Sequence, residues 1–263
     1  MELGLEGKVA WVLGASSGLG RATARSLATE GAQVAVSARR AELLDEFVAE
    51  VSGEGGRALP VPFDVSDPGA VKQAHQEVVN GLGEVDVLVA NAGGPPPGGF
   101  ARTDDEALAQ AFALTTASAW HLAKAVTPAM KERGAGCLIF LTSSSTKEVI
   151  PALLLSNMMR AAVVGLAKTL SKELGPKGIR VLCAAPGSID TDRLRSLDAR
   201  AAERSGDSVE EVRTRNQAAI PLRRYGDPKE FGDVVTFLAS ERAAYVSGIT
   251  VVVDGGALNG ILS

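Results

Sequence analysis

The amino-acid sequence predicts an α/β fold built on a doubly wound sheet of seven parallel strands, with helices on both faces. Short apolar runs alternate with longer stretches of helical period, the pattern typical of strand–helix–strand units. Runs such as VDVLVA (85–90) and CLIFLT (137–142) are mostly apolar, as parallel strands buried on both faces require. A length of 263 residues fits one large α/β domain, so we expect a single domain over residues 1–263.

The expected elements follow one another in order, each strand a short β-branched or apolar run and each helix a longer periodic stretch. The expected strands are Val9–Leu13, Gln33–Ser37, Ala58–Phe63, Val85–Ala90, Cys137–Thr142, Arg180–Ala184 and Thr250–Val253. The expected helices lie near 19–30, 41–52, 68–81, 104–132, 152–174 and 228–239.

Two segments interrupt this alternation. The stretch GGPPPGG at 93–99 is a proline- and glycine-rich loop without helix potential. The charged stretch 191–221 has a helix N-cap signal at Ser208, and we interpret it as a helical excursion over the sheet edge that contributes to the substrate site.

Composition excludes several classes of function. The net charge is −4 and no basic tract stands out, which argues against a nucleic-acid partner. No apolar run approaches the ~20 residues of a membrane span, and the N-terminus lacks a signal-peptide pattern. The two cysteines lie in apolar runs and the two histidines stand apart, so we expect no metal site and a reducing, cytoplasmic setting.

A glycine-rich turn joins the first strand to the first helix. Gly14 permits a tight turn, Gly18 lets backbone approach a phosphate, and Gly20 allows the helix to pack closely on the strand. The helix N-terminus then offers free N–H groups to a pyrophosphate. A capped helix after a plain loop is the alternative, but the strand–turn–helix–strand context favours a Rossmann-type dinucleotide site.

Several motifs recur along the chain in a fixed order: GKVAWVLGASSGLGRA, FDVSD (63–67), ANAGG (90–94), APGSIDT (185–191), GDPKEFGDVVTFLAS (226–240) and YVSG (245–248). With these motifs the sequence resembles the short-chain dehydrogenase/reductase family, and within it the β-ketoacyl-acyl-carrier-protein reductase-like members. The resemblance covers nearly the whole chain.

The resemblance implies a set of cofactor-binding residues. The pyrophosphate would lie against Gly14, Ser17, Gly18, Leu19 and Gly20, and the adenine against Asp64 and Val65. The ribose floor and the nicotinamide end would be formed by Asn91, Ala92, Gly93, Pro186, Gly187, Ile189 and Thr191. Leu13 departs from the threonine that usually opens the first motif in the family.

The end of the second strand indicates which nicotinamide cofactor binds. An acid there accepts a hydrogen bond from the ribose 2′-hydroxyl, whereas an arginine pairs with a 2′-phosphate. The sequence reads VSARR, with Ser37 and Ala38 followed by Arg39 and Arg40. We therefore predict NADP(H) in preference to NAD(H), with Arg39 as the phosphate partner. Two arginines at the start of a solvated helix are the alternative.

The resemblance also implies a catalytic site, in which family members use a tyrosine, a lysine four residues later, an upstream serine and an asparagine. The segment RAAVVGLAKTLSKELGPKGIRVLCAAPG places Arg160 in the lysine position and Ser156 in the tyrosine position. LIFLTSS places Ser143 at the substrate-binding serine, and Thr115 falls at the asparagine. Tyr225 and Tyr245 lie in distant motifs.

These substitutions change the chemistry of the predicted site. Arginine stays charged and does not exchange protons at neutral pH, and a serine hydroxyl is a far weaker acid than a phenol. Arg160 could still present donors to ribose hydroxyls, the alternative being a surface arginine. Ser156 could instead be an N-cap or first-turn hydroxyl of the helix that takes no part in chemistry. Lys147 or Glu148 could supply a proton if their loop folds inward, although a solvated loop is the simpler interpretation.

Three functions are compatible with this sequence. The first is an NADP(H)-dependent oxidoreductase that reduces a carbonyl in the manner of a 3-oxoacyl-[acyl-carrier-protein] reductase, through an atypical Ser/Ser/Arg site. The second is a catalytically weak or inactive NADP(H)-binding protein, acting as a sensor or oligomer partner. The third is a halohydrin dehalogenase-like activity; those enzymes share the arginine but keep the tyrosine and lose the nucleotide loop, the reverse of this pattern.

The expected partners are a small-molecule or acyl-carrier-bound carbonyl substrate and further copies of this chain. The helices near 104–132 and 152–174 are apolar over more than one face, so we expect a homotetramer or homodimer. The substrate would contact the loop 94–102 and the excursion. A basic patch for an acyl carrier could include Arg102, Arg193, Arg195 and Arg200, and a solvated helix explains these arginines equally well.

Overall fold

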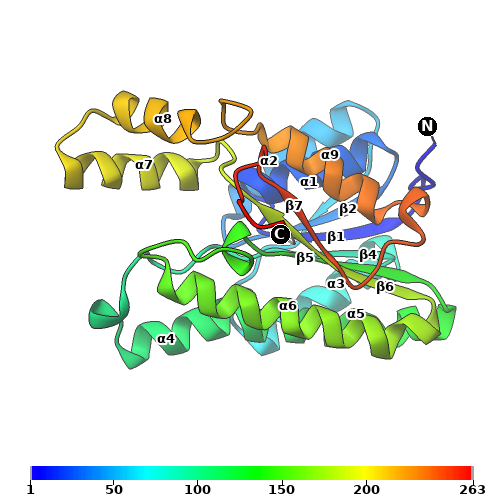
Figure 1. The fold of residues 1–263 in the computed structure, drawn as a ribbon. Helices are drawn as coiled ribbons and strands as arrows, with labels where there is room; N and C mark the ends of the chain where they lie inside the picture. The colour runs from blue at the N-terminus through cyan, green and yellow to red at the C-terminus, as the bar shows by residue number, and fades with distance from the viewer. Residues whose placement is uncertain (1, 262–263) are drawn as a thin grey trace.

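A computed structural model describes residues 2–261 and confirms the predicted fold. Seven parallel strands form one sheet in the order β3-β2-β1-β4-β5-β6-β7 (Figure 1). The strands are β1 (Val9–Leu13), β2 (Gln33–Ser37), β3 (Ala58–Pro60), β4 (Val87–Ala90), β5 (Gly136–Leu141), β6 (Ile179–Pro186) and β7 (Thr250–Val253).

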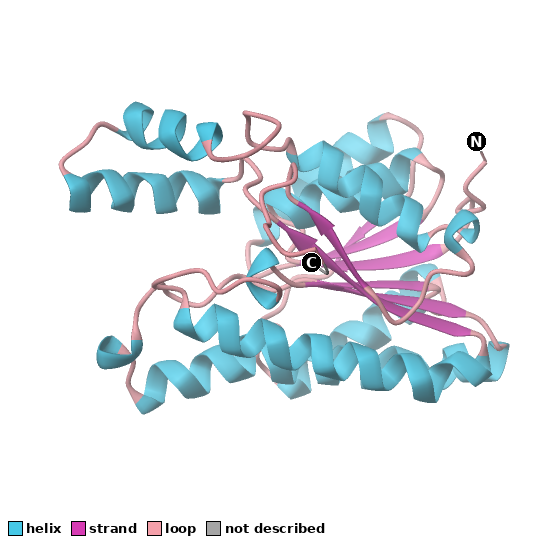
Figure 2. Cartoon of the chain, viewed as in Figure 1, coloured by secondary structure: helices cyan, strands magenta, loops and turns pink. Residues whose placement is uncertain are grey.

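Helices cover both faces of the sheet, as the colouring of Figure 2 shows. One layer contains α1 (Gly18–Thr29), α2 (Ala41–Gly53) and α9 (Pro228–Ala239). The opposite layer contains α3 (Pro68–Leu82), α5 (Ser118–Arg133) and α6 (Leu154–Leu174). The remaining helices are α4 (Asp105–Ala111), α7 (Asp192–Ser205) and α8 (Val209–Ala218).

Alternating side chains of the strands supply the two cores. In β1, Trp11 and Leu13 pack in the core beneath α3, α5 and α6, whereas Ala10 and Val12 pack beneath α1, α2 and α9. All five residues of β1 are buried, which explains why the strand carries no polar alternation. The indole N–H of Trp11 donates to the Ser37 hydroxyl at 2.9 Å, so this buried donor is satisfied.

The strand order reverses between β1 and β4. From β1 the chain proceeds to β2 and β3 on one side, and later from β4 to β7 on the other. The connections at the carboxyl ends of β1 and β4 therefore leave in opposite directions, which creates the crevice where open α/β sheets bind ligands.

Several element bounds differ from the predictions. β3 is shorter than predicted because Pro60 and Pro62 lack the N–H groups that a ladder needs. The helix predicted near 104–132 is interrupted at Phe112–Ala117 by a π-helical turn, for which the sequence carries no signal. The next helix begins at Leu154 rather than 152, since Ala152 has a left-handed φ of +61°.

The stretch 191–221 contains the antiparallel pair α7 and α8, which projects away from the sheet (Figure 1). Ser208 caps α8 in a capping box with Glu211, as its N-cap signal predicted. The buried Asp198 carboxylate of α7 accepts a hydrogen bond from Asn216 of α8 and one from the Tyr225 hydroxyl. These hydrogen bonds connect α7 and α8 to each other and to Tyr225, in the segment that precedes α9.

No helix between residues 2 and 261 is long and apolar enough to cross a membrane.

Candidate active site

A pocket of about 1120 Å³ lies at the carboxyl ends of the strands. Its walls come from the segments that follow each of the seven strands and from the starts of α6 and α7. The predicted site residues that line it are Gly14, Ser17, Gly18, Leu19, Arg39, Asp64, Val65, Asn91, Ala92, Gly93, Ser143, Ser156, Arg160, Pro186, Gly187, Ile189 and Thr191. Gly20 and Thr115 lie outside this wall.

The glycine turn has the geometry that its sequence predicts. Gly14 and Gly18 have left-handed φ values of +63° and +56°. A Cβ at Gly20 would lie 2.3 Å from the Gly14 carbonyl oxygen, which explains why Gly20 shapes the turn from behind the pocket wall. The N-cap of α1, Ser17, makes no side-chain cap, so the first N–H groups of the helix remain available to a ligand.

The floor of the pocket is open where a ribose would lie. Nothing lies within 4 Å of a Cβ built on Gly93, and the Asn91 amide packs against the Gly14 turn. Asp64 accepts hydrogen bonds from the hydroxyl and the backbone N–H of Ser66, and these bonds, with the nearby charge of Arg39, lower the pKa of its carboxyl group. The turn, the open floor and a charged acceptor together fit a nicotinamide dinucleotide.

Two exposed arginines stand at the end of β2. Arg39 is the residue predicted from sequence, and it lies near Asp64. Arg40 donates from its Nη2 to the hydroxyls of Ser16 and Ser17 at 2.8 Å each, so its guanidinium is held beside the N-terminus of α1. Arg40 was not among the predicted cofactor residues, although the serines of the glycine turn, Ser16 and Ser17, offer it hydrogen-bond acceptors.

Ser143 and Ser156 line the pocket from different elements. Ser143 follows β5, and its Oγ accepts a hydrogen bond from the Ser145 N–H at 3.1 Å. Ser156 is half-buried in the first turn of α6. The N-cap of that helix is Leu153, so Ser156 is not the cap residue; it is a first-turn hydroxyl, as the other form of the same alternative expected.

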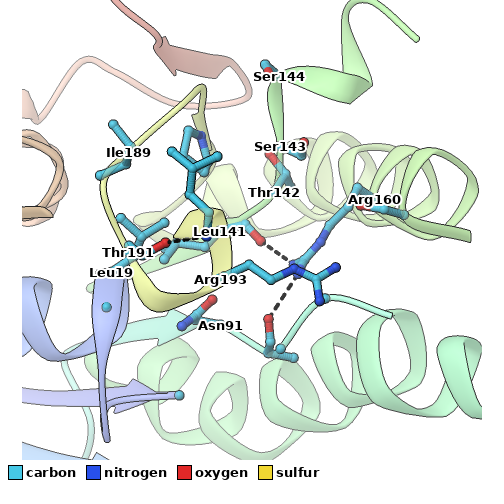
Figure 3. A pocket seen from close by; sticks show the side chains of 18 of the residues that line it. Leu19, Asn91, Leu141, Thr142, Ser143, Ser144, Arg160, Ile189, Thr191 and Arg193 are labelled. Atoms are coloured by element: carbon cyan, nitrogen blue, oxygen red, sulfur yellow. Dashed lines mark hydrogen bonds between the residues drawn. The ribbon is translucent and has the colours of Figure 1, made fainter. Parts of the chain in front are cut away.

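The guanidinium of Arg160 is buried beneath the pocket, one helical turn after Ser156. Only 7% of the residue is exposed, so the alternative of a surface arginine is wrong. Its Nη1 donates to Leu141 O at 2.7 Å and its Nη2 to Ala92 O at 2.9 Å, as the dashed lines in Figure 3 show. Arg160 therefore connects α6 to the ends of β4 and β5.

Burial, and then the charge of Arg193, lowers the pKa of Arg160 to about 10. The group remains cationic at neutral pH. It therefore acts in this site as a fixed charge and a set of N–H donors.

Thr115 lies behind Arg160 in the π-helical turn. It is buried, and with Asn91, Ala92 and Arg160 it lines a second cavity of about 10 Å³. Its Oγ1 has no hydrogen-bond partner among the described residues. The cavity has room for about one water molecule.

Other candidate proton donors are placed apart from these residues. Neither tyrosine lines the pocket: Tyr225 is tied to Asp198, and Tyr245 is fully exposed. Glu148 reaches the pocket wall, whereas Lys147 and His121 do not line it. No cluster of three metal-ligating side chains occurs within the described part of the chain.

Arg193 of α7, which the sequence places in a possible entrance patch for an acyl carrier, lines the pocket. Its Nη2 donates to Pro95 O at 2.8 Å, which brings the guanidinium over the loop after β4. No motif signals this position, because the contact depends on how α7 packs over the pocket.

The sheet order, the glycine turn at β1 and the pocket at the strand ends define a dinucleotide-binding α/β protein. A family model described as enoyl-(acyl carrier protein) reductase matches residues 14–257. Two curated relatives are oxidoreductase UcpA of Escherichia coli strain K12 and human dehydrogenase/reductase SDR family member 4. The first is 34% identical over 96% of this chain and 95% of its own length, and the second 35% over 96% and 88%. The chain belongs to the short-chain dehydrogenase/reductase family.

Solved structures of this family share the fold closely. L-sorbose reductase from Gluconobacter frateurii, complexed with NADPH and L-sorbose, has a TM-score of 0.94 at 32% identity, over 99% of this chain and 100% of that one. Actinorhodin polyketide ketoreductase with NADPH has a TM-score of 0.92 at 32% identity, over 96% and 98%. A 7α-hydroxysteroid dehydrogenase with NADH has a TM-score of 0.90 at 31% identity, over 100% and 98%.

Proposed function

We propose that this protein is an NADP(H)-dependent oxidoreductase that reduces a carbonyl compound in the manner of a 3-oxoacyl-[acyl-carrier-protein] reductase. The observation that carries this proposal is a single pocket that joins the glycine turn of β1 to Ser143, Ser156 and Arg160. The relatives named with NADPH, a sugar reductase and a polyketide ketoreductase, support the same reaction class.

The preference for NADP(H) rests on charge at the end of β2. Residues 38–41, directly after the strand, include no acidic side chain, and the Ser37 hydroxyl accepts a hydrogen bond from the Trp11 indole. Arg39 and Arg40 supply two cations at the same wall, and the second is oriented by the serines of the glycine turn. A 2′-phosphate is the cofactor group that these guanidinium groups would bind.

A bound reduced nicotinamide supplies hydride to a carbonyl carbon. The chain must then hold the carbonyl oxygen and provide a proton to it. Because the Ser143 Oγ already accepts a backbone N–H, its own hydrogen is free to point toward a substrate oxygen. We assign Ser143 to substrate binding on this basis.

The proton has to come from a group other than a phenol in this arrangement. Ser156 stands where the family resemblance expects the tyrosine, and Arg160 where it expects the lysine. We propose that the Ser156 hydroxyl gives its proton to the carbonyl oxygen and is reprotonated from solvent through a chain of water molecules. One of these waters would be held by the Thr115 hydroxyl and Arg160 in the small cavity behind the pocket, taking up a proton for each one it passes on. Weaker acid catalysis of this kind lowers rates by about 10²- to 10⁴-fold without abolishing turnover.

The second candidate is a catalytically weak or inactive NADP(H)-binding protein. The hydrogen bonds of Arg160 to two backbone carbonyls favour it, because they show the residue in a structural task that needs no catalysis. In this case the nucleotide site would serve a redox sensor or a partner within an oligomer.

Single-turnover oxidation of NADPH separates the two candidates. The protein is mixed with NADPH and a panel of ketones, oxo acids and 3-oxoacyl thioesters, including acyl-carrier-bound ones, and absorbance at the nicotinamide band is followed. Decay that depends on one carbonyl, and slows in Ser143→Ala, supports the reductase. Tight NADPH binding without decay for any member of the panel supports the binding protein.

We also propose that the chain assembles as a homodimer or homotetramer through α4, α5 and α6. Large apolar side chains are exposed along these helices and the π-helical turn between the first two. They are Leu108, Phe112, Trp120 and Met158, of which Phe112 and Trp120 each expose about half of their surface.

A further inference from the structure

A second cation approaches Arg160 across the pocket. Arg193 donates to Pro95 O and Arg160 donates to Ala92 O, so both guanidinium groups bind the loop that follows β4. A Cβ built on Gly94 would lie only 3.0 Å from Arg193 Nη2, so the guanidinium lies directly against the loop backbone at this glycine. In Figure 3 the two side chains point toward one another. Two positive charges therefore face the same part of the pocket.

Neither of these arginines has a carboxylate partner. Among residues 2–261, no ion pair within 4.0 Å involves Arg160 or Arg193. Arg195 on the same helix is, by contrast, paired with both Asp190 and Asp192. Arg160 is buried, and a buried guanidinium without a counter-ion is costly, whereas Arg193 is exposed and adds a second positive charge beside it. An anionic ligand would offset the cost at Arg160.

The acidic side chains of the pocket wall are engaged elsewhere. The carboxylate of Asp64 accepts from Ser66, and that of Asp254 accepts from the backbone N–H groups of Gly256 and Leu258. Asp192 pairs with Arg195, and Glu148 accepts a hydrogen bond from the Asn259 N–H. None of these groups neutralises the arginine pair.

We infer that Arg160 and Arg193 bind a carboxylate of the substrate, so that the substrate is an oxo acid. This inference rests on the proposed function and narrows its substrate class. Both Nη atoms of Arg160 already donate to backbone carbonyls, but each still carries a second N–H. Arg193 uses only Nη2 on the loop, so its other N–H groups can bind a carboxylate in parallel hydrogen bonds. The other anion that could reach this place is the cofactor pyrophosphate, and the experiment separates the two.

The test is calorimetric titration, with and without saturating NADPH, of 2-oxo-, 3-oxo- and 4-oxopentanoate and their methyl esters. At least one acid should bind about 10-fold or more tightly than its ester. Arg193→Gln should weaken the binding of that acid by about 10- to 100-fold and leave the binding of the ester unchanged. Arg193→Lys should retain part of the affinity for the acid. Arg204→Gln, in the last turn of the same helix and away from the pocket wall, is the matched control.

Three results would overturn the inference. The acids and their esters could bind with equal affinity, or no acid could bind. Arg193→Gln could also weaken the binding of NADPH as much as that of the acid, which would assign the arginine to the cofactor. Because calorimetry needs no turnover, failure of every carbonyl to oxidise NADPH would count against the proposed reductase while the preference for a carboxylate remained measurable.

Discussion

At residue 160 a buried cation makes contacts that a lysine could not reproduce. A single ammonium group cannot present the planar fork with which Arg160 reaches Leu141 O and Ala92 O together. The side chain thus joins the ends of β4 and β5 and also lines the pocket.

Replacing Arg160 by leucine should lower the free energy of unfolding by about 2–4 kcal/mol, because two buried carbonyl oxygens lose charged donors. Urea denaturation measures this change. Lys172→Leu, on an exposed part of the same helix, should leave the midpoint nearly unchanged. Equal stability of Arg160→Leu and the wild type would show that these hydrogen bonds contribute nothing.

Arg40 provides a second prediction at the scale of one residue. Its guanidinium is oriented by Ser16 and Ser17, so Arg40→Ala should raise the dissociation constant for NADPH about 10-fold and leave that for NADH unchanged. Fluorescence titration with both nucleotides, repeated for Arg39→Ala, shows which arginine binds the phosphate. If neither variant discriminates between the nucleotides, the proposed preference is wrong.

The two buried thiols predict how stability depends on pH. Burial raises the pKa of Cys137 to about 11 and that of Cys183 to about 12, from a usual value of 9.0. Between pH 9 and 11 the folded chain therefore keeps protons that the unfolded chain releases, so stability falls as pH rises, by roughly 1.4 kcal/mol per pH unit for each thiol. A Cys137→Ala, Cys183→Ala double variant, compared by urea denaturation at pH 8 to 11, should show a shallower fall; an identical slope would contradict the prediction.

At the scale of elements, the π-helical turn between α4 and α5 directs Thr115 toward the back of the site. Turns of this kind often occur at functional sites. The Ser118 hydroxyl donates hydrogen bonds to two backbone carbonyl oxygens of this turn, Leu114 O and Thr115 O. The turn therefore leaves the Thr115 hydroxyl available to the small cavity beside Arg160.

Thr115→Val tests the role of that hydroxyl, since it removes a buried polar atom that has no partner among the described residues. Stability should change by less than about 1 kcal/mol, because the hydroxyl bonds to no described residue and only its hydrogen bond to the proposed water is lost. The single-turnover rate should fall at least about 10-fold if the hydroxyl orients a proton-relaying water. A variant with unchanged stability and unchanged rate would exclude the relay, and Thr115→Ser should recover most of the rate.

At the scale of the whole molecule, the exposed apolar face of α4, α5 and α6 predicts self-association. Analytical ultracentrifugation should show a dimer or tetramer at micromolar concentration. Trp120→Glu places a charge in the middle of this face and should shift the equilibrium toward monomer, whereas Phe237→Glu on α9 serves as a matched control on another surface. Sedimentation of the wild type as a monomer would refute the proposed assembly.

The architecture could be predicted from the sequence because each strand is an apolar run and the turn after β1 contains glycines where the backbone needs a positive φ. Gly14 and Gly18 have positive φ where the pattern required it. The surroundings of Arg160 could not be predicted, since its partners are backbone carbonyls 19 and 68 residues away. The same holds for Arg193 and for the π-helical turn, which arise from packing between distant segments and have no local sequence pattern.

The attachment of Arg160 to the ends of β4 and β5 also constrains how this protein can evolve. A change at position 160 alters the sheet and the pocket floor at once, so the effect of introducing a tyrosine at 156 depends on which residue stands at 160. We therefore expect substitutions at the two positions to be epistatic. A mutational route toward a Tyr/Lys pair would pass through a less stable intermediate unless Leu141 O and Ala92 O first acquired other donors.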